Sequence, residues 1–161
     1  MPFLISDSLE SREQRIRQYL DEGEPVIAVL LAAADCERTI RRAIVALSAL
    51  PTATIRKKLT KRGTNSISGY GVAWERYVRP HREWALDGEV VDSYDELKKA
   101  FKLRNTLVHG EQGRTGVEYS GRKVETILKA TRSVTELAQG HGVDLMERIT
   151  VRQRPRPRRR S

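Results

Sequence analysis

The sequence predicts an all-α fold, a bundle of four to six helices. Apolar residues recur every three or four positions over several long segments, which is the spacing of one helix face. No segment has a convincing strand pattern, although residues 89–91 and 115–119 have enough β-formers to pair briefly. With 161 residues, 39% of them hydrophobic and 32% charged, the chain suffices for one domain with a buried core and polar outer faces.

The N-terminal third predicts two helices. The first covers residues 8–22, with Asp7 or Ser8 as its cap and a glycine after its last turn. The second covers residues 25–50, begins with a proline in its first turn and closes at Pro51. Its first half is apolar nearly all round, so we expect it to lie at the centre of the bundle.

The middle of the chain is more irregular. Residues 54–62 predict a short basic helix or turn, and the glycines and serines of residues 63–71 predict a flexible loop. A helix around residues 72–86 follows, which we expect Pro80 to interrupt. The aromatic residues of this region either stack on nucleic-acid bases or belong to the core, and their helical spacing favours the core.

Two longer helices are predicted in the C-terminal half. Ser93 and Glu96 form a capping box that opens a helix over residues 93–109, and Gly110 closes it. After a glycine-rich loop, the last helix covers residues 121–139.

The positive charge is concentrated at the C-terminus. The net charge is +9, but seven arginines and no acidic residue lie from Arg148 onwards, and without them the charge is +2. We therefore expect a helical domain over residues 1–147 and a disordered arginine- and proline-rich tail over residues 148–161. The tail either attracts RNA or DNA phosphates without sequence specificity or is a tolerated, solubilising terminus.

Other features limit the cellular context. The chain has a single cysteine, Cys36, which excludes an internal disulfide and fits a reducing cytoplasm. We expect this cysteine to be a small buried hydrophobic residue. The longest apolar run, residues 25–34, is too short to span a bilayer, and the N-terminus lacks the pattern of a secretory signal, so we expect no membrane partner. No histidine and cysteine cluster has metal-ligand spacing, so we expect no metal.

Two charged residues interrupt the apolar helix faces. The stripe over residues 94–108 skips position 104, where Arg104 stands inside the apolar face. The stripe over residues 26–47 skips position 37, which Glu37 occupies. An unpaired buried charge costs several kcal/mol. We therefore expect these two residues to face each other, directly or through a polar cluster with Arg41.

The helix over residues 93–109 ends in an arginine, an asparagine and a histidine, which together are able to bind a phosphate and move a proton without a metal. Asn105 lies at the edge of the apolar stripe. His109 lies about 40° further round, toward the side of Lys98 and Lys102.

The spacing of arginine and histidine is not specific by itself. Arg76 and His81 share it, but Pro80 would break the helical geometry there, so we interpret that pair as chance. Arg104 and His109 differ because they lie at a helix end and the arginine breaks the apolar stripe. The structural alternative is that Arg104 forms only a buried ion pair and His109 only caps the helix.

The R-N-x-L-V-H run of residues 104–109 resembles the signature of HEPN domains, all-α proteins that include many metal-independent ribonucleases. Residues 37–42 are similar to an acidic-x3-basic-basic element on an early helix of some members, and the order of helices fits over residues 8–140. One subgroup has a tyrosine two positions after the histidine, which a partner nucleotidyltransferase modifies. Glu111 stands there in this chain, so we do not expect that regulation.

The resemblance implies a metal- and cofactor-independent endoribonuclease, in which the ribose 2′-oxygen attacks the neighbouring phosphate. His109 would transfer protons, and Arg104 would hold the pentacoordinate phosphate. Asn105 would orient the histidine or the phosphate, with Glu37 and Arg41 in support. The family also implies a homodimer with two motifs in one cleft, and a role as a toxin or antiviral effector with a possible antitoxin or inhibitor partner.

Basic residues are expected to flank this cleft and bind RNA. These are Lys98, Lys102 and, from the short basic segment, Arg56, Lys57 and Lys58. The alternative to an enzyme is a non-catalytic HEPN-like module that binds nucleic acid or a partner protein.

Overall fold

The computed structural model describes residues 7–110 and 115–154, and within them the chain is all-helical, as predicted. These residues form seven helices and contain no β-strand, only an isolated bridge between Asp87 and Val91. The helices are α1 (Leu9–Asp21), α2 (Pro25–Leu47), α3 (Thr52–Leu59), α4 (Ile67–Tyr77), α5 (Arg79–Arg82), α6 (Tyr94–Val108) and α7 (Val117–Gly140).

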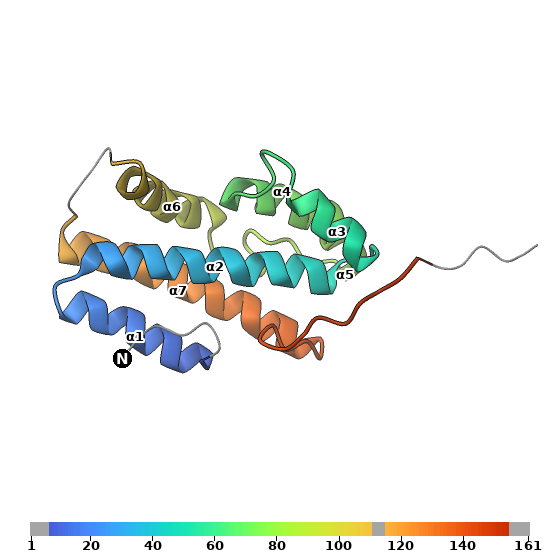
Figure 1. Ribbon diagram of the computed structural model, residues 1–161, viewed down its shortest axis with the longest axis horizontal. Helices are drawn as coiled ribbons and strands as arrows, with labels where there is room; N and C mark the ends of the chain where they lie inside the picture. The colour runs from blue at the N-terminus through green and yellow to red at the C-terminus, as the bar shows by residue number, and fades with distance from the viewer. Residues whose placement is uncertain (1–6, 111–114, 155–161) are drawn as a thin grey trace, which may run out of the picture.

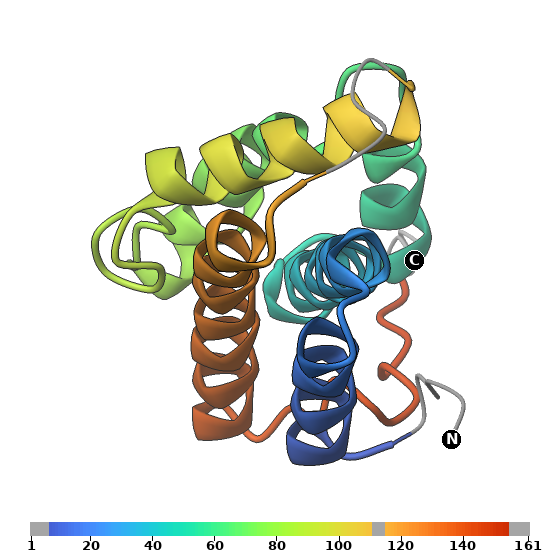
Figure 2. The ribbon, with the colours of Figure 1, turned by 90° about the vertical axis from the view of Figure 1, so that its left-hand side faces the viewer.

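Helix α2 lies at the centre, as its apolar sequence predicts. Helices α1 and α7 run along it, and α3, α4 and α6 lie on its other side (Figure 1). The end view shows α6 crossing over both α2 and α7 (Figure 2). Fully buried small residues, among them Ala28, Ala32 and Ala43, let the neighbouring helices approach α2 closely.

Serine caps open three of the helices. The hydroxyls of Ser8, Ser66 and Ser93 each accept a hydrogen bond from the backbone N–H three residues further on. The predicted capping box is half formed, since Ser93 Oγ accepts from the N–H of Glu96 at 3.2 Å. The Glu96 carboxylate instead pairs with Lys99.

The predicted loop over residues 63–71 is wrong in its second half, because α4 begins at Ile67. The glycines there serve close packing. A Cβ atom on Gly69 would lie 2.5 Å from the carbonyl oxygen of Gly63, so the preceding loop rests directly on the helix. Composition alone does not separate a glycine needed for contact from one needed for flexibility.

The interruption predicted near Pro80 is confirmed, because α4 ends at Tyr77 and Pro80 lies in the separate one-turn helix α5, which accounts for the seventh helix. Residues 83–86, predicted to be helical, are not. Trp74 is fully buried and its indole N–H donates to the carbonyl oxygen of Trp84 at 3.0 Å, which confirms that this indole belongs to the core. The other helices begin and end within four residues of the predicted bounds.

The predicted disorder of the tail does not hold for residues 148–154. Ile149 is buried, and the backbone N–H of Arg152 donates to Thr52 Oγ1 at 2.8 Å. In return, the Thr52 N–H donates to the carbonyl oxygen of Arg152 at 3.1 Å. This C-terminal strap, residues 148–154, therefore belongs to the domain, while the prediction for residues 155–161 lies outside the described residues.

A buried ion pair that the sequence did not reveal joins α1 to α2. Arg12 Nε donates to Asp35 Oδ2 at 3.0 Å, and both side chains are only 2% exposed. A second guanidinium nitrogen donates to the carbonyl oxygen of Asp7 at 2.6 Å. Burial of two charges is costly unless each remains paired, so this contact strongly constrains how α1 docks.

We predict that Asp35→Ala lowers the free energy of unfolding by about 3–5 kcal/mol, because it leaves the Arg12 guanidinium buried without its carboxylate. Denaturant unfolding measures this loss. The matched control is Glu125→Ala, which breaks an exposed pair with Arg17 and should change stability by less than about 1 kcal/mol. Equal, small losses in both variants would contradict this role for the buried pair.

Candidate functional site

The opposite charges predicted in two apolar seams meet where α6 crosses α2. Arg104 Nη2 lies 2.5 Å from Glu37 Oε1, and the side chains are 23% and 26% exposed, respectively. The direct pairing is therefore confirmed. Within residues 7–110 and 115–154, Arg41 forms no hydrogen bond or ion pair with either residue, so the pair does not act through it.

The guanidinium of Arg104 is held from three directions. Beside its bond to Glu37, its Nη1 donates to Asn105 Oδ1 at 3.1 Å. Its Cζ lies 5.5 Å from the centre of the Phe101 ring, within the range of a cation–π contact. The arginine fork has five donors, so these bonds leave others able to bind an anion.

The Glu37 carboxylate is partly desolvated by burial. Burial raises the pKa of the Glu37 carboxyl, and the charge and hydrogen bond of Arg104 oppose this rise. Burial also raises the pKa of the neighbouring Tyr70, with Arg41 opposing the rise and the Glu37 charge adding to it. Arg41 thus lies within electrostatic reach of this cluster without bonding to the ion pair.

A second group of side chains lies on the solvent face of α6. Lys98, Lys102, Asn105 and His109 follow one another at steps of four, three and four residues, which places them within about 60° of helix surface. All four are exposed, and we call them the α6 stripe. Lys98 also pairs with Asp95 at 2.8 Å. The predicted position of His109 on the side of the two lysines is confirmed.

His109 ends the helix. Its backbone N–H donates to the carbonyl oxygen of Asn105 at 3.0 Å, and Gly110 follows with a φ of +70°. Its position is about 140° around the axis from Arg104. In the described part of the chain, no hydrogen bond joins the imidazole to the side chain of Arg104 or Asn105. The arginine therefore faces α2, while the histidine faces solvent.

The basic residues of segment 54–62, which were predicted to flank this site, do not lie beside it. Arg56, Lys57 and Lys58 belong to α3, which packs on the C-terminal end of α2. Glu37 lies about 15 Å from Leu47 along the α2 axis, at 1.5 Å per residue. The structure brings together Glu37, Arg104 and the α6 stripe, but not the α3 cations.

Exposed apolar residues near the motif were not predicted. Ile27, Val108, Val117 and Tyr119 are large and exposed, and they belong to the start of α2, the end of α6 and the start of α7. These helix ends lie at one end of the molecule (Figures 1 and 2). Only Val108 belongs to the motif, and nothing in the sequence shows that the other three share this end.

The described residues contain no group of three histidine, cysteine, aspartate or glutamate side chains arranged to hold a metal. None of the described helices is both long and apolar enough to cross a membrane. Comparison with protein-family models, curated proteins and solved structures finds no match for this chain. The functional argument therefore rests on the residues and their geometry.

We predict that Arg104→Met destabilises the protein more at about pH 7 than at about pH 4. Loss of the arginine raises the already elevated pKa of Glu37 further, because burial is then unopposed. A raised carboxyl pKa means that stability is fully present below the ordinary pKa and is lost as pH rises through the folded-state value.

Denaturant unfolding of wild type and variant across this pH range measures the effect. The control is Arg104→Met combined with Glu37→Gln, for which the difference from Glu37→Gln alone should not depend on pH. A destabilisation of Arg104→Met that stays constant with pH would show that the two charges do not interact.

Proposed function

We propose that this chain is a metal-independent endoribonuclease of HEPN type. The observation that carries the proposal is the anchoring of Arg104 to Glu37, directly beside the exposed α6 stripe. Exposed Asn105 directly follows Arg104 and accepts a hydrogen bond from its guanidinium, and exposed His109 ends the same helix. The arrangement supports phosphate binding at the edge of the stripe.

The proposed reaction needs two proton transfers and one anchored cation. The ribose 2′-hydroxyl loses its proton to a base, and its oxygen attacks the adjacent phosphorus. The bond from phosphorus to the 5′-oxygen breaks, and that oxygen takes a proton from an acid. The products are a 2′,3′-cyclic phosphate and a 5′-hydroxyl.

Each residue has a role in this scheme. His109 acts as the acid, because imidazole is the side chain best suited to proton transfer near neutral pH and this one is exposed at the end of α6. Arg104 stabilises the charge on the pentacoordinate phosphate with donors not taken by Glu37. Asn105, which already accepts from Arg104, orients the guanidinium. Glu37 is a positioning residue, since it holds the guanidinium and has no direct part in the chemistry.

A second copy of the chain would supply the second proton-transfer group. One chain brings a single histidine to the α6 stripe, and the scheme requires both an acid and a base. The exposed apolar residues at the same end of the molecule, including Ile27, Val117 and Tyr119, support association there. A role as a toxin or antiviral effector, with an antitoxin or inhibitor protein as partner, belongs to the same proposal.

The alternative is a non-catalytic module that binds nucleic acid or protein. It is favoured by the orientation of the two principal side chains, since His109 lies about 140° around the helix from Arg104. In that case the ion pair is structural and the stripe only holds a ligand. Turnover distinguishes the two functions, because a binding module retains RNA without cutting it.

We predict that the full chain cleaves mixed tRNA and mRNA in excess EDTA, leaving 2′,3′-cyclic phosphate and 5′-hydroxyl ends. Replacement His109→Ala should lower the rate by about 10²- to 10⁴-fold, because it removes general acid–base catalysis. Gel assays with chemical analysis of the RNA ends measure both results, and circular dichroism checks that the variant is folded.

The matched control is His81→Ala, which removes the histidine of the other Arg-x4-His pair, on exposed α5. This variant should cleave RNA like the wild type. Retention of RNA without cleavage would reject the enzyme and favour the binding module. Cleavage by His109→Ala at the wild-type rate would reject the role assigned to His109.

A further inference from the structure

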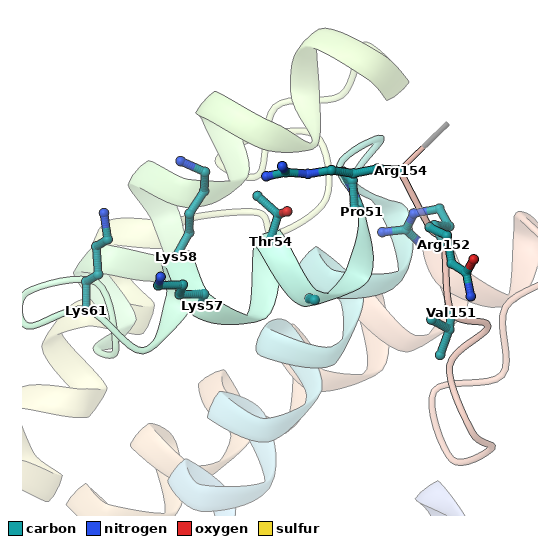
Figure 3. A pocket seen from close by; sticks show the side chains of 10 residues that line it. Pro51, Thr54, Lys57, Lys58, Lys61, Val151, Arg152 and Arg154 are labelled. Carbon is teal, nitrogen blue, oxygen red and sulfur yellow. The ribbon is translucent and has the colours of Figure 1, made fainter. Parts of the chain in front are cut away.

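A basic groove lies between α3 and the C-terminal strap, away from the α6 stripe. Its volume is about 580 Å³, and its charged lining residues are Lys57, Lys58, Lys61, Arg152 and Arg154. No carboxylate lines it. Figure 3 shows Lys57 and Lys58 on α3, Lys61 just after its end, and the Arg154 side chain reaching from the strap over Thr54.

Arg152 builds one wall of the groove. Its guanidinium donates to the carbonyl oxygens of Val45, Ala46 and Leu50, at 2.5, 3.2 and 3.0 Å. These carbonyls end α2 or follow it, where helix geometry leaves them without intrahelical partners. Burial, and the nearby charge of Arg82, lower the pKa of Arg152. This arginine is committed to holding the strap in place.

The other four cations of the groove are not held in this way. Within the residues that the structure describes, Lys57, Lys58, Lys61 and Arg154 form no ion pair. Lys58 only lies over the Tyr77 ring, at 5.5 Å.

Several exposed cations elsewhere on the molecule are paired with nearby carboxylates. Lys99 pairs with Glu96, Arg122 with Glu118, and Lys129 with Asp92. The groove differs from these sites because, among the described residues, it gathers four unpaired cations and no carboxylate lines it.

The sequence explains this difference. No acidic residue occurs between Glu37 and Glu75, although eight lysines and arginines lie between them. The strap adds three arginines and again no acid. Like charges held together repel one another, and a bound polyanion relieves that repulsion. The fold brings the two acid-free segments against each other through Arg152.

We propose that the basic groove binds the sugar-phosphate backbone of single-stranded RNA, an inference that rests on the proposed ribonuclease function and extends it. A groove with cations on both walls follows an extended backbone, and the apolar side chains of Pro51 and the half-exposed Val151 offer contact to sugars or bases. A lipid surface would instead require a protruding basic face.

The placement of the groove fits a docking role. Helices α3 and α6 lie on the same side of α2 (Figure 1). The groove sits at the C-terminal end of α2, about 15 Å along its axis from Glu37. An RNA strand held there would extend toward Arg104 without occupying the reactive site.

The test uses the full chain and a fluorescent single-stranded oligonucleotide of 2′-O-methyl RNA. This probe has no free 2′-hydroxyl, so it binds without being cleaved. Anisotropy titrations at several salt concentrations compare wild type with the triple variant Lys57→Gln, Lys58→Gln, Lys61→Gln. We expect affinity to fall roughly 10- to 100-fold at about 0.1 M salt, and the salt-dependence slope to fall by about 2, because each lost phosphate contact removes about 0.7.

The matched control is Lys99→Gln, Arg122→Gln, Lys129→Gln, which removes the same charge from sites outside the groove. Its slope should equal that of the wild type, and thermal unfolding should show both variants folded. Equal losses in the two triple variants would overturn the proposal, because they would reflect net charge alone. Unchanged binding by the groove variant would overturn it as well. Tighter, lysine-dependent binding to anionic phospholipid vesicles or to polyglutamate would do the same.

This test is independent of catalysis. The affinity that the groove variant loses does not depend on whether the chain cuts RNA, because the probe has no free 2′-hydroxyl. If the chain is an enzyme, the groove variant should raise KM for RNA and leave kcat unchanged, since the lysines do not touch the reacting phosphate. A lowered kcat with unchanged KM would overturn the assignment of these lysines to docking.

Discussion

The ion pair between Glu37 and Arg104 constrains the arrangement of everything around the candidate site. Each charge occupies a position that the helix period assigns to an apolar side chain, so neither is tolerated at the seam alone. Helix α6 must therefore cross α2 at the register that brings the guanidinium to the carboxylate. Because a helix is rigid, that register also sets the direction of the α6 stripe and the position of His109.

The same pair connects stability to the proposed function. Glu37 holds the guanidinium in a partly dry environment, where an arginine interacts more strongly with an anion than it would in water. Asn105 and the Phe101 ring restrict it further. A phosphate that approaches the edge of the stripe would meet a cation already fixed in orientation, which is the arrangement that electrostatic catalysis requires.

Much of the fold was predictable because helical periodicity is a local property. The interruptions of that period at positions 37 and 104 were visible for the same reason, and they led to the ion pair. The Arg12–Asp35 pair was not predicted, because α1 carries many charges and its buried face is poorly marked in the sequence. Its existence depends on how two helices dock.

The other wrong predictions from the sequence also involve tertiary contacts. Gly69 looked like part of a flexible loop, but its missing side chain allows a loop to pack on α4. The arginine-rich strap looked disordered by composition, but carbonyls at the end of α2 bind Arg152. The cations of α3 were expected beside the motif, and only the three-dimensional arrangement places them at the C-terminal end of α2. Local patterns identify helices and charges but do not say which distant segments meet.

The most direct test of the central claim is an NMR titration of the full chain with a non-cleavable 2′-O-methyl dinucleotide, too short to span both surfaces. Our account predicts that one binding event shifts the guanidinium signals of Arg104 and the imidazole signals of His109 together. Shifts confined to the α3 lysines, or an Arg104 signal that does not respond while His109 does, would show that the ion pair is structural and has no part in binding a phosphate.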